Sequence, residues 1–292
     1  MVGYSESVAY GAATIVNAIA LGKGAALGIG LKTTARVELT NEVGVIRGRV
    51  ASDPEEKTSL IEAAVLTVLK HYHLDRTHGA KVETNSNIPV ARGLKSSSVA
   101  ANAVALAAVG ALGKKIRDSQ LLELSVNAAT SAGTTITGAF DDTSASYFGG
   151  IVVTDNRTRR ILKRTLPPRE YAVVLYIPNR KAYTAKVDVA KFKLAAPQVE
   201  TAFKEAVSGR YWHALTLNGF IHCAILGEDP NPALEALGAG ATAAGLSGKG
   251  PATAAVVHED KVDAVMEAWA GRRGKVVKTH LNREKSHITK ME

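Results

Sequence analysis

The sequence predicts an α+β fold organised in two lobes. With 292 residues the chain reaches the size at which single hydrophobic cores stop growing, which is about 250–300 residues. Strand-like alternation opens the chain, helical spacing follows it, and a second set of strands follows the pair Pro167-Pro168. These observations predict lobes over residues 1–166 and 167–292, with a cleft between them.

The first lobe is expected to begin with sheet. Residues 8–31 are apolar, but Asn17, Lys23 and several glycines interrupt them, and no basic segment precedes them. This pattern favours a buried strand and turn over a signal peptide or a membrane helix. Residues 37–39 and 43–50 alternate on either side of a turn signal and predict a hairpin.

Helices and further strands complete the first lobe. Residues 52–56 place a cap, a proline and acids ahead of apolar residues at helical spacing, which predicts a helix ending near Tyr72. The remaining predicted elements are a strand at 81–84, a polar loop at 85–95, helices at 96–112 and 119–131, and strands at 149–153 and from about 160 to 166.

The second lobe is predicted to follow a β-α-β-β-α-β order, the split βαβ arrangement. Its expected elements are a strand at 171–177, helical material at 189–227 interrupted at Pro197, strands at 241–245 and 253–257, a helix at 261–270 and a strand at 276–279.

Composition limits the class of function. The formal net charge is +9, yet the Lys and Arg residues are scattered without a recognised nucleic-acid motif, so a small anionic ligand suits the charge at least as well as nucleic acid. A single cysteine, Cys223, excludes an intramolecular disulfide framework and favours a reducing compartment, the cytoplasm. The oligomeric state is left open.

The segment from Ile88 to Ala101 carries the strongest chemical signal. A glycine and three serines run directly into an Ala-rich helix, where free backbone amides and the helix dipole favour an anion such as a triphosphate. Serines also cap helices, and by composition alone capping is about as probable as phosphate binding. A helix needs only one capping residue, however, so three serines exceed that need. The Walker pattern of P-loop kinases is absent, which disfavours that class of kinase.

This segment resembles the central motif of the GHMP kinases (galactokinase, homoserine kinase, mevalonate kinase and phosphomevalonate kinase). The form Gly-Leu-Lys-Ser-Ser-Ser at 93–98 resembles the archaeal shikimate kinase branch. The resemblance implies a first lobe of ribosomal S5 domain 2-like type and a ferredoxin-like second lobe. It assigns ATP binding to Pro89, Ala91, Arg92, Gly93, Leu94, Lys95, Ser96, Ser97 and Ser98.

The resemblance extends to a pair of acids at 141–142. Asp142 falls where mevalonate kinase-like members carry the aspartate that deprotonates the acceptor hydroxyl, so Asp142 is the expected base and Asp141 the reserve. A carboxylate in hydrogen-bond reach of the hydroxyl can orient it and accept its proton. Without the family, a solvated turn would be the preferred interpretation of both acids.

Two more segments resemble family motifs and are expected to contact the acceptor substrate. They contribute Thr14, Asn17 and Lys23 near the N-terminus, and Gly248, Lys249 and Gly250 in a C-terminal glycine loop. The first segment lacks the lysine that mevalonate kinases carry there, which leaves Lys23 and Lys95 as candidates for its role.

The family resemblance implies Mg²⁺ as well as ATP, since the ion bridges phosphate oxygens during phosphoryl transfer. Ser97 is the candidate ligand, and Glu123 is a possible acidic one. The implied reaction transfers the γ-phosphate of ATP to the 3-hydroxyl of shikimate. Alternatives are homoserine or mevalonate kinase activity and a non-catalytic nucleotide or sugar sensor. Arg92, Lys249 and Arg283 are the available cations for the substrate carboxylate.

Overall fold

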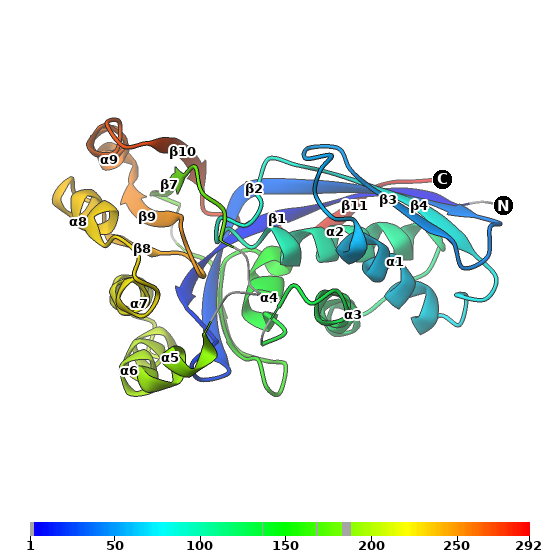
Figure 1. Ribbon diagram of the computed structural model, residues 1–292, viewed down its shortest axis with the longest axis horizontal. Helices are drawn as coiled ribbons and strands as arrows, with labels where there is room; N and C mark the ends of the chain where they lie inside the picture. Colours follow the sequence, from blue (N-terminus) through cyan, green and yellow to red (C-terminus); the bar gives the residue numbers. More distant parts are fainter. Residues whose placement is uncertain (1–2, 136, 168, 183–187) are drawn as a thin grey trace.

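The computed structural model describes residues 3–135, 137–167, 169–182 and 188–292. Two β-sheets, each with its own helices, lie side by side along the long axis of the molecule (Figure 1). This arrangement confirms the predicted α+β fold with two lobes.

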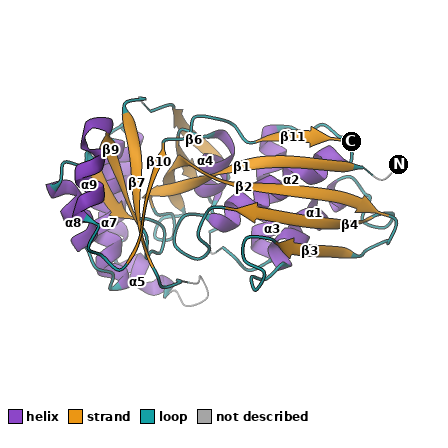
Figure 2. Cartoon of the chain, turned by 90° about the horizontal axis from the view of Figure 1, so that it is seen from above, coloured by secondary structure: helices purple, strands orange, loops and turns teal. Residues whose placement is uncertain are grey.

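The sheet of the first lobe is built around two long antiparallel strands, β1 (Tyr4–Val16) and β2 (Lys23–Thr40). They confirm the predicted strand and turn at the start of the chain. Along β2, Lys32, Thr34 and Arg36 are exposed while the residues between them are buried, so one face of this sheet meets solvent. Figure 2 shows the strand order β11-β1-β2-β4-β3 from above.

The predicted hairpin at residues 37–50 is wrong. Strand β3 (Ile46–Val50) pairs in parallel with β4 (Gly79–Ser86), and β4 lies between β3 and β2. The reason is the connection through α1 (Ser59–His71), because a helical crossover places two strands in parallel where a tight turn cannot. Helix α1 begins after N-cap Thr58, later than the acids at 52–56 suggested.

Four helices cover the inner face of this sheet (Figure 1). With α1 these are α2 (Ser96–Ala111), α3 (Asp118–Ser131) and α4 (Phe140–Phe148). The small alanines of α2 are buried nearly all round, which allows the helix to pack closely on β1 and β2. Beyond α4, β5 (Ile151–Asp155) pairs with the first half of β2 and with β6 (Arg160–Thr165).

The second lobe has the predicted split βαβ order. Strands β7 (Tyr171–Pro178), β8 (Ala243–Leu246), β9 (Thr253–His258) and β10 (Gly274–His280) form an antiparallel sheet in the order β10-β7-β9-β8. The helical elements are α5 (Val189–Leu194), α6 (Ala196–Val207), α7 (Tyr211–Leu226), α8 (Asn231–Gly238), the short 3₁₀ helix η2 (Glu259–Lys261) and α9 (Val262–Ala268).

Two details of this lobe differ from the prediction. Pro197 does not interrupt a helix but lies in the first turn of α6, where its missing N–H costs nothing. Helix α8 was not predicted, because its eight residues follow a proline-rich turn and precede glycines.

The two lobes share one hydrophobic core. Val173 and Leu175 of β7 belong to the same cluster as Ile15, Leu27 and Phe203, so apolar packing is continuous from one sheet to the other. The alternate residues of β7 pack under α8 and α9 around Trp269.

The last strand, β11 (His287–Met291), was not predicted and pairs with β1 of the first lobe. The chain therefore passes from the second sheet back to the first after β10. The predicted boundary falls between β6 and β7, and Pro168 itself lies outside the described residues. No helix in the described part of the chain is long and apolar enough to cross a membrane.

Candidate active site

The chain enters α2 through an unusually tight loop. Ala91, Gly93 and Lys95 all have positive φ angles, of 54°, 84° and 64°. A Cβ atom on Gly93 would lie 2.2 Å from the Ser247 carbonyl oxygen, so only glycine fits there. Lys95 is the N-cap residue and its side chain makes no capping hydrogen bond.

The three serines at 96–98 follow this cap and do not act as the cap themselves. They occupy the first turn of α2, where backbone N–H groups have no partner inside the helix. All three line a cavity of about 800 Å³ between the lobes. The geometry therefore favours anion binding over the capping interpretation.

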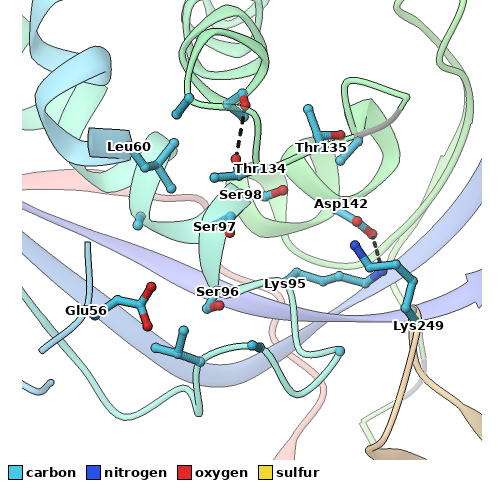
Figure 3. Close-up of a pocket in the computed structure, with 18 of the residues that line it drawn as sticks. Glu56, Leu60, Lys95, Ser96, Ser97, Ser98, Thr134, Thr135, Asp142 and Lys249 are labelled. Atoms are coloured by element: carbon cyan, nitrogen blue, oxygen red, sulfur yellow. Dashed lines mark hydrogen bonds and ion pairs between the residues drawn. The ribbon is translucent and has the colours of Figure 1, made fainter. Parts of the chain in front are cut away.

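A second helix begins at the same cavity. Helix α4 follows Gly138 and Ala139, which both have positive φ, and it carries Asp141 and Asp142 in its first turn. The Lys95 Nζ atom lies 3.0 Å from Asp142 Oδ1, and both side chains are only about a tenth exposed. Figure 3 shows this ion pair beside the serines. The acids thus begin a helix, and the solvated turn that the residues alone would favour is not formed.

The two acids differ in environment. Asn156 Nδ2 donates to Asp141 Oδ1 at 2.7 Å, and the Asp141 backbone N–H donates back to Asn156 Oδ1 at 3.2 Å. Thr154 orients Asn156 by a further hydrogen bond of 2.7 Å. Burial and then the charge of Asp142 raise the pKa of Asp141 to about 7. Asp142 is the acid that is paired with a cavity lysine.

The glycine loop between β8 and β9 closes the cavity from the second lobe. The Gly248 N–H donates to Thr14 Oγ1 at 2.9 Å, and Asn17 Nδ2 donates to the Gly248 carbonyl at 2.9 Å. Ser247 Oγ donates to the Gly93 carbonyl at 2.8 Å. These contacts join three of the four predicted segments at one place.

The cavity has two ends, with the serines of α2 between them. In Figure 3, Glu56 and Leu60 lie on one side of the serines, and Asp142 and Lys249 lie on the other. Asn17 also lines the cavity and lies next to Lys249 in space, because it donates to the Gly248 carbonyl. A cavity of about 800 Å³ with the first turn of α2 between its two ends is large enough for two small ligands.

Nine of the predicted site residues line the cavity, besides the two acids. They are Asn17, Ala91, Gly93, Lys95, Ser96, Ser97, Ser98, Gly248 and Lys249. Six other predicted residues, all of them described, lie outside the lining: Thr14, Lys23, Pro89, Arg92, Leu94 and Gly250.

The residues outside the lining have other contacts. Lys23 lies over the Phe203 ring, 5.6 Å from its centroid, and does not line the cavity. Of the two candidate lysines, Lys95 is the one that lies beside Asp142. Arg92 donates to the carbonyl groups of Pro178, Asn179 and Arg180 at the end of β7. Glu123 is exposed on α3 and does not line the cavity.

Sequence reasoning missed the end of the cavity near Glu56. Glu55 and Glu56 lie in the loop before α1, and Lys181 from the second lobe lies 3.3 Å from Asp53 and 3.7 Å from Glu56. These acids had been interpreted only as helix-start residues. Thr134 and Thr135 also line the cavity, and no motif in the sequence marks them.

Comparison with known proteins agrees with this geometry. Residues 59–150 match the family described as the GHMP kinases N terminal domain. The chain is 44% identical over 283 residues to the shikimate kinase of Methanothermobacter thermautotrophicus, an alignment that covers 95% of this chain and 96% of that protein. The chain belongs to the archaeal shikimate kinase branch of the GHMP kinases.

Solved structures support the GHMP kinase fold. The Methanococcus jannaschii mevalonate kinase aligns with a TM-score of 0.76 at 16% identity, covering 96% of this chain and 98% of that one. The homoserine kinase of Cytophaga hutchinsonii aligns with a TM-score of 0.75 at 17% identity, covering 98% and 97%. As a GHMP kinase the protein is an ATP-dependent phosphotransferase.

Proposed function

We propose that this GHMP kinase transfers the γ-phosphate of ATP to the 3-hydroxyl of shikimate, giving 3-phosphoshikimate and ADP. The observation that carries the chemistry is the Lys95–Asp142 ion pair at the start of α2, inside a cavity lined by three serines. The choice of shikimate rests on the relatives, which are 43–46% identical across most of the chain.

In the proposed reaction, Asp142 accepts a hydrogen bond from the acceptor hydroxyl and takes its proton as the oxygen attacks the γ-phosphorus. The new O–P bond forms while the bond to the β-phosphate oxygen breaks, and ADP leaves. Lys95 and the first-turn amides of α2 offset the charge on the phosphate oxygens. Positioning and charge neutralisation supply most of the rate enhancement in such transfers.

Asp141 has a supporting role in this proposal. Its carboxyl group is held by Asn156, and its raised pKa favours the neutral form near Asp142. A neutral neighbour limits the repulsion that two adjacent carboxylates would otherwise experience.

Mg²⁺ is part of the proposal because hydroxyl oxygens suit this hard cation, which usually takes one or two protein ligands and several phosphate oxygens. Ser97 in the first turn of α2 would be the protein ligand. When bound, the ion neutralises phosphate charge. A cytoplasmic location and the absence of a nucleic-acid partner stay predictions from the sequence.

A coupled ADP-release assay tests the function, with ATP, Mg²⁺ and a panel of shikimate, homoserine and mevalonate. We expect turnover with shikimate alone, and we expect Asp142→Asn to lower kcat by about 10²–10⁴-fold with little change in the KM for ATP. Asn is the matched replacement because it keeps the shape and loses the base. Turnover with another acceptor would reject shikimate, and no turnover with any acceptor would favour the sensor hypothesis.

A further inference from the structure

The Lys249 backbone is held rigidly at the boundary between the lobes. Its neighbour Gly248 bonds through both its N–H and its carbonyl group to Thr14 and Asn17 of the first lobe. The Gly250 N–H donates to the Ser247 carbonyl at 2.9 Å and so closes the loop on the other side. Lys249 is therefore no solvated turn lysine, and its side chain enters the cavity (Figure 3).

The side chain of Lys249 ends in a cluster of charges. In Figure 3 its amino group lies beside Asp142, with the Lys95 amino group on another side of the same carboxylate. The charged groups that act on it are Lys95 at the start of α2 and Asp142 on α4, and Asp141 is next to Asp142 in the same helix. Two amino groups thus lie near one carboxylate, which forms its 3.0 Å ion pair with Lys95.

The surroundings of Lys249 disfavour its charged form. Burial and the nearby charge of Lys95 lower the pKa of Lys249 to about 8, although Asp142 opposes the shift. An anion that enters this end of the cavity would offset the second positive charge and favour the ammonium form of Lys249.

The ATP phosphates are not the best candidates for that anion. They are assigned to the serines of α2, whereas in Figure 3 the Lys249 side chain lies beside Asp142. The acceptor must place its hydroxyl against Asp142. In shikimate the carboxylate and the 3-hydroxyl stand on ring carbons separated by one other carbon, so the carboxylate comes near whatever flanks Asp142.

Comparison of the three cations considered for the substrate carboxylate also favours Lys249. Arg92 donates to carbonyl groups at the end of β7, and Arg283 donates to the Pro167 carbonyl. Neither lines the cavity, whereas Lys249 does. We propose that Lys249 binds the carboxylate of the acceptor and makes the enzyme selective for an anionic alcohol. This inference rests on the proposed function.

The test combines an enzyme variant with a substrate variant. Wild type and Lys249→Met are assayed with shikimate and with its uncharged methyl ester. We expect wild type to prefer the acid by about 10- to 100-fold in kcat/KM, as a charge-assisted hydrogen bond would give. In Lys249→Met the preference should fall to about threefold or less, with the KM for ATP almost unchanged. A variant that keeps the wild-type preference would overturn the inference.

Control variants separate charge recognition from damage to the loop. Lys249→Arg keeps the positive charge and should retain most of the preference for the acid. Lys23→Met removes a lysine that lies over Phe203 outside the cavity, and it should keep the wild-type ratio. A loss of preference in Lys23→Met, or equal loss in Lys249→Arg and Lys249→Met, would contradict the proposal.

Proton uptake supplies a second measurement that does not depend on turnover. At pH 8.5 most of Lys249 is neutral, and a bound carboxylate favours the ammonium form, so shikimate binding should take up protons. Calorimetry in buffers of different ionisation enthalpy measures this uptake, which should vanish in Lys249→Met. Uptake that persists in the variant would refute the assignment. If wild type phosphorylates no shikimate, the proposed function itself fails, which is a different result.

Discussion

Replacing Lys95 by Met should weaken both the fold and the reaction. The Lys95 and Asp142 atoms are 3.0 Å apart and both side chains are about nine-tenths buried. At an effective dielectric constant of about 20, their attraction is about 5 kcal/mol, and desolvation of the two groups removes a large part of it. Loss of Lys95 leaves the negative charge of Asp142 without its ion-pair partner, although Lys249 is nearby.

We therefore expect Lys95→Met to lower the free energy of unfolding by about 2–3 kcal/mol, which is a fall in Tm of about 4–10 °C. Met matches the length of the lysine stem, so lost packing contributes little. Activity should fall by about 10²-fold or more, because the same charge acts on the phosphate oxygens. Urea denaturation and the ADP-release assay measure the two effects.

A double-mutant cycle with Asp142→Asn isolates the pair. If the ion pair acts as described, the sum of the two single losses in unfolding free energy should exceed the loss in the double variant by about 2 kcal/mol, since the double variant removes both partners of the pair. Additive losses, within about 0.5 kcal/mol, would refute the reasoning.

Three further predictions concern residues around this pair. The pKa of Asp141 is raised from 3.8 to about 7, so between these pH values the folded state binds a proton that the unfolded state does not. The free energy of unfolding should therefore fall as the pH rises from about 4 to 7. Urea denaturation at several pH values measures this slope, and Asp141→Asn should flatten it. Gly93 has φ 84° and faces the Ser247 carbonyl, so Gly93→Ala should lower the free energy of unfolding by about 2 kcal/mol or more and raise the KM for ATP. Gly113 has φ 62° and open space around it, so the control Gly113→Ala should lose only the backbone strain of about 1 kcal/mol. Thr14→Val leaves the buried Gly248 N–H without its acceptor, so unfolding free energy should fall by about 1–3 kcal/mol, and Thr14→Ser should restore it.

Local patterns predicted the parts of the fold that local physics determines. The Ala-rich helix at 96–111 and the strand alternation of β7 and β9 depend on residue spacing within one element, and the structure confirms them. The hairpin at 37–50 failed because the partner of β3 is decided by the α1 crossover, which no local turn signal reveals. Strand β11 was missed for a similar reason, since the strand with which it pairs, β1, lies far from it in the sequence.

The site was predictable where a motif marks it and not where tertiary contacts make it. The serines at 96–98 and the acids at 141–142 were found from their segments. The role of Lys95 beside Asp142 required the fold, because 47 residues of chain separate the two. Thr14 was predicted as a substrate contact, but its hydroxyl accepts the Gly248 N–H, a partner more than two hundred residues away.

Strand β11 has a consequence for biosynthesis. Because His287–Met291 forms the edge strand beside β1, the first sheet is incomplete until this segment, which follows the second lobe in the sequence, has been synthesised. Until then the first lobe exposes the backbone N–H and C=O groups of β1, an open edge that invites association with other chains. Pairing of β11 covers that edge of β1, so completion of the first lobe depends on synthesis of the second.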